Sequence, residues 1–409
     1  MWQTDVVIIG AGQAGLAMSQ RLLQREIRHV VIERGEVAER WRNERWDTLR
    51  LLTPNWMSRL PGWSYEGPDP DGFMTKHDYA GWLAGYAAAA ALPVVTGTNV
   101  TAVRRLGTGY QVVTDHGTWH AQAVVIATGH CDVPLVPAMA RQLPPDIHQV
   151  TTADYRNPAG LPDGGVLVVG ASASGVQLAE EIRQSGREVA ISVGRHMRLP
   201  RRYRGHDIMW WLDRLRVHAQ GQPMDLAAAR SQPSMQLVGR PAADNIDLRT
   251  LRDIGVRLLG RALGIEAGTL HLKDDVAETV GEAEARLQRL LGRIDAVADA
   301  YGAVMEVPPC GLASEGSPVT LDLAAAGIRT VVWATGFVRN YQWLHVPVLD
   351  AAGEIAHCGG VTSAPGLFVT GLRFLRRWNP SFIDAVSADA IELAAEVQRH
   401  LRHGIRAAA

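Results

Sequence analysis

Short apolar runs, each followed by a glycine-containing turn, dominate the pattern of hydrophobic and polar positions in this chain. The first run covers residues 5–9 and is followed by a helical apolar pattern and a second run at residues 29–32. Similar runs lie at residues 123–126, 165–169, 189–193, 330–333 and 366–369. Continuous apolar runs of this length are typical of strands buried on both faces of a parallel sheet. The pattern therefore predicts an α/β protein in which a strand–turn–helix–strand unit occurs twice.

Weaker patterns predict several of the remaining elements. Residues 75–91 are predicted to form a helix, and two alternating runs at 109–114 and 118–121 predict a β-hairpin. Apolar residues recur at intervals of three and four from Val276 to Tyr301, which is the spacing of one helix face. Because periodic Leu and Ile usually belong to a core, this stripe predicts one long packed helix and no cofactor contact.

Composition and charge narrow the class of protein. The chain has 409 residues, of which 47% are hydrophobic and 20% are charged, as in a globular protein of two or three domains. A net charge of −1 gives no general attraction to nucleic acid or to an anionic membrane, so neither is expected as a partner. A strand that starts near Trp2 leaves no room for a signal peptide, and the alanine-rich apolar run at 80–92 is too short to span a membrane. We therefore expect a cytoplasmic protein.

The three cysteines, Cys131, Cys310 and Cys358, are far apart and form no C-x-x-C pair. That spacing indicates neither a disulfide framework nor a zinc site, and no metal is expected.

The first glycine turn has the spacing of a dinucleotide-binding site. Gly10 permits the tight turn, Gly12 lets the backbone approach a pyrophosphate, and Gly15 lets the helix pack closely on the strand. The pyrophosphate would then sit on the N–H groups at the start of the helix. Glu33 ends the second strand, where a carboxylate can accept hydrogen bonds from a ribose diol. We expect an adenine dinucleotide with an unphosphorylated ribose here.

The second glycine turn differs at two points. Its glycines are Gly170 and Gly175, with Ser172 in the middle position, and a serine can still approach a phosphate and donate to it. The strand that follows ends without an acid and leads into a basic stretch that contains Arg195 and Arg201. Arginine recognises a 2′-phosphate, which a carboxylate would repel, so this site predicts NADPH. The alternative is an ordinary solvated basic loop.

A loop rich in tryptophan and arginine follows the first unit. It includes Trp41, Arg42 and Trp46, whose indole and guanidinium planes can stack on rings or pair with phosphate. The alternative is that these aromatic residues only fill the core beneath a long loop.

Taken together, the motifs resemble those of the flavoproteins with two dinucleotide-binding domains, and within that group the flavin-containing monooxygenase family, especially its bacterial flavoprotein monooxygenases. The segments that carry the resemblance are Gly10 to Gly15, Arg45 to Pro54, Ala127-Thr128-Gly129, Tyr155-Arg156-Asn157-Pro158, Gly170 to Gly175 and Ala334-Thr335-Gly336-Phe337. The resemblance implies two Rossmann-like domains, with an NADPH domain inserted within the FAD domain and a helical segment near the substrate pocket. The expected boundaries are 1–155 for the first part of the FAD-binding domain, 156–327 for the NADPH-binding domain and 328–409 for the second part of the FAD-binding domain.

Site residues follow from the matching positions. Those expected to contact FAD are Gly10, Gly12, Gln13, Ala14, Gly15, Glu33, Arg34, Trp41, Arg42, Trp46, Leu52, Ala127, Thr128 and Gly129. Those expected to contact NADPH are Gly170, Ser172, Ser174, Gly175, Arg195, Arg201, Ala334, Thr335 and Gly336. No side chain is identified as an acid or base, and the weak catalytic candidates are Thr53 and Asn379. Asn379 is predicted to cap a last helix whose N–H groups could face the flavin.

The family resemblance also implies a reaction. NADPH reduces FAD, O₂ adds to the reduced ring, and the resulting C4a-(hydro)peroxyflavin transfers one oxygen atom to a nitrogen or sulfur, less readily to a ketone, of a small molecule. The flavin carries the chemistry, and the protein positions the reactants and excludes water. A homodimer is compatible with the sequence.

The sequence departs from the family pattern in two features. The fingerprint F-x-G-x-x-x-H-x-x-x-Y ends at Tyr155, which puts Thr151 in the histidine position, Ile147 in the glycine position and Pro145 in the phenylalanine position. His148 lies three residues too early, so either the loop has shifted or the fingerprint role is lost, and loss is favoured. In addition, the asparagine that many members place beside the flavin aligns with Leu52.

These departures keep two other functions open. One is an NADPH oxidase that releases H₂O₂, and the other is a flavin-binding regulatory or transport-associated protein without turnover. A flavin disulfide reductase is disfavoured because it needs a redox dithiol.

Overall fold

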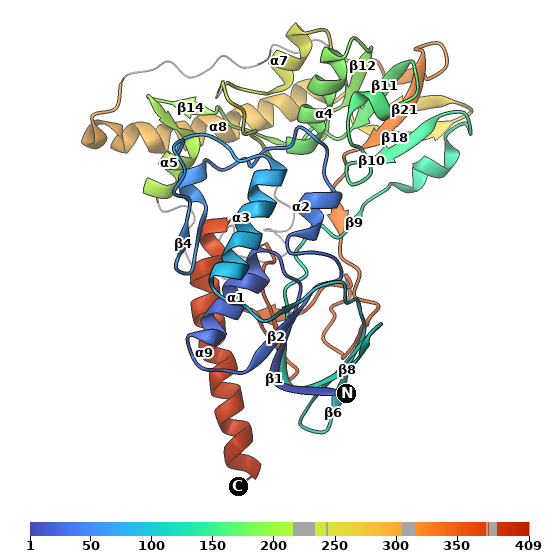
Figure 1. The fold of residues 1–409 in the computed structure, drawn as a ribbon. Helices are drawn as coiled ribbons and strands as arrows, with labels where there is room; N and C mark the ends of the chain where they lie inside the picture. The colour runs from blue at the N-terminus through green and yellow to red at the C-terminus, as the bar shows by residue number, and fades with distance from the viewer. Residues whose placement is uncertain are drawn as a thin grey trace.

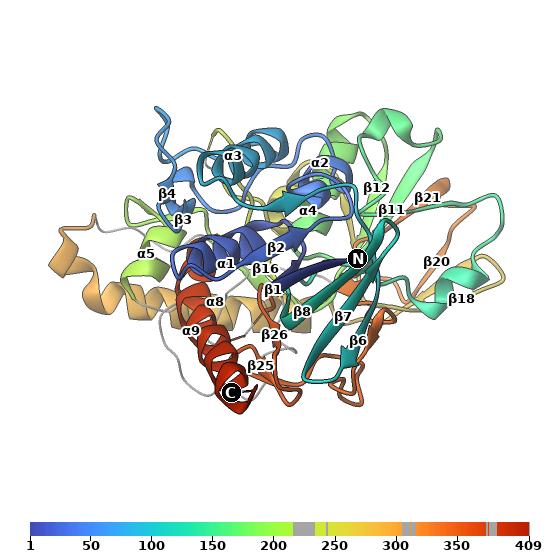
Figure 2. The same ribbon diagram turned by 60° about the horizontal axis from the view of Figure 1, so that its bottom comes forward.

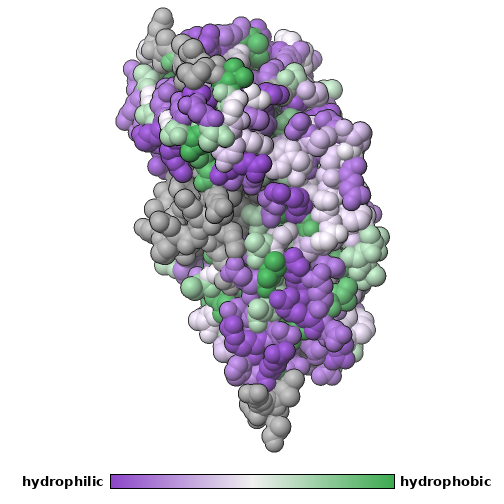
Figure 3. Space-filling model, turned by 90° about the vertical axis from the view of Figure 1, so that its left-hand side faces the viewer, coloured by the Kyte–Doolittle hydropathy of each residue, from purple (hydrophilic) through white to green (hydrophobic). Residues whose placement is uncertain are grey.

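The computed structural model describes residues 1–215, 234–242, 244–304, 312, 316–373, 375 and 383–408. Two positions named above, Cys310 and Asn379, lie outside the described residues. Within the described part of the chain, no helix is both long and apolar enough to cross a membrane. Figure 3 shows one face of the molecule, where polar residues predominate and apolar ones are scattered among them.

The first sheet has a parallel centre and an antiparallel extension, in the order β23-β6-β7-β8-β1-β2-β5, with β26 paired to β8. Its strands are β1 (Trp2–Ile9), β2 (His29–Ile32), β5 (Val94–Val95), β6 (Val100–Leu106), β7 (Gly109–Thr114), β8 (Gly117–Ile126), β23 (Leu344–His345) and β26 (Leu367–Val369). Ile9 lies beside both Ile32 and Ile126, and Ile126 beside Val369. The carboxyl ends of four parallel strands therefore meet at one edge. The predicted hairpin is confirmed as β7 and β8.

Helices cover one face of this sheet. They are α1 (Gln13–Leu23), α3 (Lys76–Ala89) and α9 (Ile383–Ala408), and Figures 1 and 2 both show α9 alongside α1. Met18, Leu22, Val386 and Leu393 are buried together in this layer. Thr75 begins α3 with a capping box, in which its side chain and that of Asp78 each bond the other's backbone N–H. The helix predicted at 75–91 is confirmed.

The second sheet is entirely parallel, in the order β10-β21-β11-β12-β17. Its strands are β10 (His148–Thr151), β11 (Gly165–Val169), β12 (Val189–Ser192), β17 (Arg257–Leu259) and β21 (Ile328–Trp333), with α4 (Ala173–Gln184) and α7 (Leu248–Asp253) beside them. The expected domain boundaries need correction, because β10 precedes residue 156 and β21 follows residue 327. The apolar run of β21 fits any parallel sheet, so the sequence pattern alone does not say which sheet it joins.

A further helical layer lies in the upper part of the molecule in Figure 1, below α7, and its apolar cluster includes Met57. The long helix predicted from Val276 is confirmed as α8 (Val276–Ala298), followed by a 3₁₀ turn at Asp299–Tyr301. Its apolar face packs on α5 (Ile208–Arg214) through Leu287, Leu291 and Ile294. Two short strands, β13 (Met197–Arg198) and β16 (Met235–Gln236), pair in parallel beneath it.

Further small elements complete the described chain. They are α2 (Glu39–Asn43), β3 (Arg59–Leu60), β4 (Trp63–Ser64), β9 (Val133–Pro134), β14 (Arg202–Tyr203), β15 (His206–Asp207), β18 (Ala262–Glu266), β19 (Thr269–Leu272), β20 (Thr320–Asp322), β22 (Phe337–Val338), β24 (His357–Cys358), β25 (Val361–Thr362), and 3₁₀ turns at Asn55–Met57, Ala138–Gln142 and Pro158–Gly160.

Candidate functional site

The first glycine turn leaves room for a ligand at one glycine only. Gly10 has φ +107°, and a Cβ there would lie 2.7 Å from the Ala127 carbonyl oxygen. A Cβ on Gly15 would lie 1.9 Å from the Gly10 carbonyl oxygen. A Cβ on Gly12 would meet no protein atom within 4 Å. Gly12 lies at the start of α1 and lines a cavity there. Packing therefore requires glycine at positions 10 and 15, whereas the space at Gly12 is open for a diphosphate.

Glu33 is held at the end of β2 by the turn itself. Its carboxylate accepts the Ala11 N–H at 2.7 Å and the Gly35 N–H at 3.2 Å, and the side chain is largely buried. Glu33 lines the same cavity as Gly12. A carboxylate oxygen has lone pairs beyond one hydrogen bond, so Glu33 can also accept a ribose hydroxyl.

A cavity of about 420 Å³ lies over this turn at the carboxyl edge of the first sheet. Of the residues expected to contact FAD, it is lined by Gly10, Gly12, Gln13, Ala14, Glu33, Arg34, Trp41, Ala127, Thr128 and Gly129. Its other lining residues are Ile9, Ile32, Ala38, Glu39, Arg40, Arg45, Thr98, Asn99, Val100, His130, Cys131, Asp132, Val133, Asn340, Trp343 and Gly371. The glycine cradle, the fixed carboxylate and the arginines fit an adenine dinucleotide such as FAD.

Four of the expected FAD residues lie elsewhere. Gly15 packs beneath the turn, and Arg42 donates to the Val37 carbonyl oxygen at 3.0 Å. Trp46 is buried in the apolar core beside the second sheet. For this residue the alternative interpretation, that the aromatic side chain only fills the core, therefore applies. Leu52 packs against the cluster beneath α5 and α8. The catalytic candidate Thr53 is buried and does not line the cavity.

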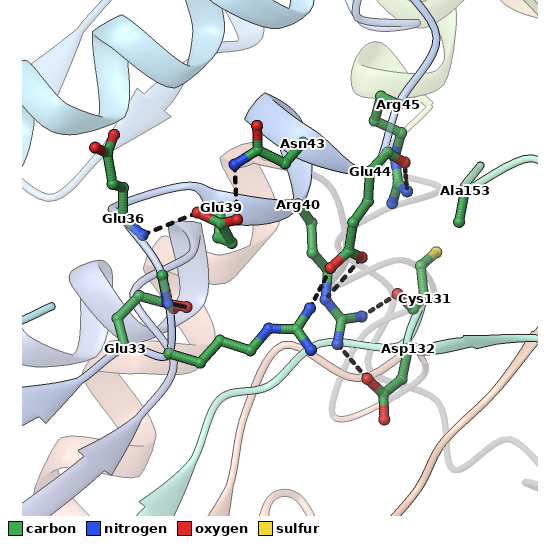
Figure 4. A network of polar contacts seen from close by, with 12 residues as sticks. Glu33, Glu36, Glu39, Arg40, Asn43, Glu44, Arg45, Cys131, Asp132 and Ala153 are labelled. Carbon is green, nitrogen blue, oxygen red and sulfur yellow. Dashed lines mark hydrogen bonds and ion pairs between the residues drawn. The ribbon is translucent and has the colours of Figure 1, made fainter. Parts of the chain in front are cut away.

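A polar network that the sequence motifs did not indicate forms one wall of the cavity (Figure 4). The Arg40 guanidinium donates to the Cys131 carbonyl oxygen and pairs with Asp132, and its Nε lies 3.7 Å from Glu44. Glu44 also pairs with Arg34. These contacts connect α2 with the chain that follows β8. No signal in the sequence brings the two segments together, because they lie about ninety residues apart.

Arg45 is the cation of this wall without an acidic partner. Its guanidinium donates to the Glu44 carbonyl oxygen at 2.6 Å and lies 5.6 Å from the centre of the Phe337 ring, and no ion pair joins it to a carboxylate among the described residues. Burial lowers the pKa of Arg45. A half-buried guanidinium at a cavity can bind an anion such as a diphosphate. Arg45 stands in the motif that carried the resemblance, but the sequence did not identify it as a site residue.

Cys131 lines the cavity beside these cations. Burial alone would raise the pKa of its thiol, but the charge of His130, a hydrogen bond with His130 and the charges of Arg45 and Arg40 lower it to about 7. The thiolate is the reactive form of cysteine. Cys131 is therefore expected to be a thiolate at neutral pH to a greater extent than an ordinary cysteine.

We predict that iodoacetamide alkylates Cys131 with a pH midpoint near 7, because the pKa of this thiol is about 7. The rate should rise as the pH rises through that value and fall below it. Quantitative mass spectrometry of the Cys131 peptide measures the rate, with Cys131→Ser as the control for label at other sites. Because Cys131 lines the cavity, saturating FAD should slow its alkylation. A midpoint near the ordinary thiol pKa would contradict the prediction.

The second glycine turn repeats the geometry of the first. Gly170 has φ +109°, and a Cβ there would lie 2.4 Å from the Ala334 carbonyl oxygen. A Cβ on Gly175 would lie 1.8 Å from the Gly170 carbonyl oxygen. Ser172 begins α4, and its side chain makes no capping hydrogen bond. Ser172 and the half-buried Ser174 are thus placed at the start of a helix, as a phosphate site requires.

After Ala334 the chain leaves the unit built on the second sheet and passes to the unit built on the first sheet. Thr335 Oγ1 donates to the Leu135 carbonyl oxygen, and Leu135 N–H donates to the Gly336 carbonyl oxygen at 2.9 Å. Phe337 then pairs with Pro134 between β22 and β9. The two units are therefore joined by the short antiparallel pair of β9 and β22.

The two arginines proposed for the 2′-phosphate lie in different surroundings. Arg195 is exposed on the loop after β12. Arg201 is 1% exposed, pairs with Asp207, donates to the Leu52 carbonyl oxygen at 2.8 Å and lies 4.8 Å from the Phe73 ring centre. The expectation for Arg201 needs correction, because its guanidinium already joins the two units and is not accessible to a phosphate.

The fingerprint positions do not meet the cavity. Thr151 ends β10, where its Oγ1 donates to Asp154 at 2.6 Å and accepts the Ala153 N–H at 3.3 Å. His148 and Pro145 are exposed, and Ile147 and Tyr155 are buried. Thr151 therefore forms a local turn, and His148 does not line the cavity in its place.

Comparison with known proteins gives one family and several relatives. The family model "Pyridine nucleotide-disulphide oxidoreductase" matches residues 7–213. An uncharacterized oxidoreductase, CzcO-like, of Geobacillus kaustophilus is 33% identical over 402 residues, which cover 97% of this chain and 99% of the relative. The indole-3-pyruvate monooxygenase YUCCA8 of rice is 31% identical over 216 residues, 48% of this chain and 49% of that protein.

Solved structures share the fold. A flavin-containing monooxygenase from Stenotrophomonas maltophilia superposes with a TM-score of 0.68 at 19% identity, covering 98% of this chain and 99% of that one. The bacillithiol disulfide reductase of Bacillus cereus superposes with a TM-score of 0.61 at 16% identity, covering 97% of this chain and 99% of that one. At these identities the likeness concerns the fold. It confirms the expected α/β class with dinucleotide-binding units.

Proposed function

This chain belongs to the pyridine nucleotide-disulphide oxidoreductase family and is a flavoprotein oxidoreductase with FAD and NADPH as its cofactors, and from that premise we propose that it is a monooxygenase. In this proposal it takes two electrons from NADPH and transfers one oxygen atom of O₂ to a nitrogen or sulfur of a small organic molecule, while the second oxygen atom is reduced to water.

One observation carries the proposal. Two glycine turns of the same geometry lie on one chain, and among the residues that the structure describes, Cys131 is the one cysteine that lines the cavity at the first turn. Reduction of a disulfide needs a second thiol, and the three cysteines of the sequence form no close pair. An electron path from NADPH to FAD without a dithiol suits a reaction with O₂. The match of half the chain to a plant monooxygenase supports the same reaction class.

The protein's own residues have defined tasks in this proposal. FAD supplies the redox chemistry and the activation of O₂ when bound. The open space at Gly12 admits its diphosphate to the N–H groups of α1, and Glu33 accepts a ribose hydroxyl. Arg45 lines the same cavity and offers a positive charge there. Gly170, Ser172 and Gly175 hold the pyridine nucleotide in the same manner at α4.

The assignment of Arg195 to the 2′-phosphate gives a sharp prediction. Because Arg195 is exposed after β12 and the strand end carries no acid, Arg195→Ala should raise the KM for NADPH about tenfold or more and leave the KM for NADH nearly unchanged. Steady-state kinetics with both nucleotides measure this split. Arg202, which is also exposed in the same basic stretch, is a further candidate for the 2′-phosphate, so Arg329→Ala, at an exposed arginine near the start of β21, is the control. Equal effects on both nucleotides would contradict the assignment.

The reaction type is tested on FAD-loaded protein. NADPH oxidation in air and released H₂O₂ are measured with a panel of amines, sulfides and ketones. Substrate-stimulated oxidation with little H₂O₂ and an oxygenated product is the expected result. Oxidation with stoichiometric H₂O₂ for every compound would instead favour an NADPH oxidase, and no oxidation would favour a flavin-binding protein without turnover.

The oxidase is the second candidate because of one observation. The Thr151 side chain in the fingerprint position is engaged with Asp154, and His148 lies away from the cavity. Those residues are therefore not placed to protect an oxygenated flavin from water.

A further inference from the structure

Gln236 is attached to the second glycine turn although it lies far from that turn in the sequence. It ends β16, next to Arg198 of β13, and its side chain is 1% exposed. Its Nε2 donates to the Ala171 carbonyl oxygen at 2.6 Å, and Ala171 is the residue between Gly170 and Ser172. A carbonyl oxygen can only accept, so the amide orientation of Gln236 is fixed with its own oxygen directed away from Ala171.

The segment that carries Gln236 is itself closely packed. A Cβ on Gly239 would lie 1.8 Å from the Leu51 carbonyl oxygen and 2.7 Å from the Phe73 ring. The Val238 carbonyl oxygen accepts from Arg201 at 3.3 Å. The chain is therefore held in place directly after Gln236.

The other polar atom of Gln236 has no partner. Oε1 is buried and accepts no hydrogen bond, which costs about 1–3 kcal/mol unless a donor meets it. Gln236 also lines a cavity of about 10 Å³ together with Arg198, Asp247 and Glu284. A space of that size holds one water molecule or one hydroxyl group.

The charges around the cavity favour a neutral donor. Arg198 pairs with Asp247 at 2.9 Å and with Glu284 at 2.8 Å, so its charge is already compensated by two carboxylates. Arg249, whose Nε lies 3.8 Å from Asp253, also lines the cavity. The carboxylates of Asp247 and Glu284 can accept a hydrogen bond from a hydroxyl. A hydroxyl on a ligand at the second glycine turn suits both Oε1 and this environment.

We propose that Gln236 belongs to the pyridine-nucleotide site: its amide nitrogen holds the second glycine turn in place, and its carbonyl oxygen accepts a hydrogen bond from a ribose hydroxyl of the nucleotide. This assignment rests on the proposed use of NADPH. Since NADH and NADPH share ribose hydroxyls and differ in the 2′-phosphate, Gln236 contributes equally to the binding of both.

The test is direct binding of NADP⁺ and NAD⁺ to FAD-loaded protein by isothermal titration calorimetry. Gln236→Met keeps the length of the side chain and removes both hydrogen bonds, so it should raise the Kd of both nucleotides about tenfold or more with an unchanged ratio between them. Gln236→Glu keeps an acceptor but loses the donor to Ala171, and should also weaken both. FAD content and thermal midpoint serve as folding controls.

The alternative outcomes separate the two proposals. If Gln236→Met binds both nucleotides as the wild type does, a buried water satisfies Oε1 and the inference about Gln236 is wrong. A change confined to NADP⁺ would place the 2′-phosphate at Gln236 and overturn the hydroxyl assignment. If the wild type binds neither nucleotide, the proposed use of NADPH fails, and the role of Gln236 fails with it.

Discussion

Replacing Gly12 by valine is expected to give a folded protein that retains almost no FAD. A Cβ at this position would meet no protein atom within 4 Å, so we expect the polypeptide to tolerate the substitution. The side chain would instead occupy the space at the start of α1, where the diphosphate has to approach the N–H groups. We expect at least a hundredfold loss of FAD affinity, measured by the ratio of flavin to protein absorbance after purification and by fluorescence titration of the apoprotein.

Gly15→Val is the matched comparison within the same turn. Its Cβ would lie 1.9 Å from the Gly10 carbonyl oxygen, so this variant should lose the fold as well as the cofactor. Circular dichroism and thermal unfolding of the two apoproteins distinguish the cases. If Gly12→Val retains FAD like the wild type, the first glycine turn does not bind the diphosphate, and the assignment of the cavity to FAD is wrong.

The paired glycine turns show what a local pattern can predict. Each turn is determined by a strand, three closely spaced small residues and the helix that follows, so its geometry follows from neighbours in the sequence. The same close approaches occur in both, from Gly10 to Ala127 and from Gly170 to Ala334. The long helix from Val276 was predictable for the same reason, because its apolar stripe has one period throughout.

Contacts between segments that are far apart in the sequence could not be predicted from the local pattern of hydrophobic and polar residues. The apolar run of β21 fits either sheet, and only its pairing with β11 and β10 assigns it to the second. Arg45 and Cys131 both line the cavity, although no pattern in either sequence segment predicts that they lie close together. A basic stretch likewise does not reveal which of its arginines faces water, and in the structure Arg195 does while Arg201 does not.

Arg201→Met is expected to lower the free energy of unfolding by about 3–5 kcal/mol, because it removes one partner of a buried ion pair. Asp207 would keep its charge without the guanidinium that now pairs with it, and the Leu52 and Val238 carbonyl oxygens would each lose a donor. Urea unfolding of the FAD-loaded protein measures the loss. Arg202→Met is the matched control, since Arg202 is exposed and should change stability by no more than about 0.5 kcal/mol.

The double variant Arg201→Met with Asp207→Asn tests the physical cause of this loss. Asp207 also begins α5, where its Oδ1 accepts the Met209 N–H at 2.7 Å, and asparagine serves that capping role nearly as well. If the uncompensated carboxylate dominates, the double variant should recover a large part of the stability that Arg201→Met loses. If it recovers nothing, the loss comes from the carbonyl oxygens and the Phe73 ring, and Arg201 acts mainly by joining the two units through neutral contacts.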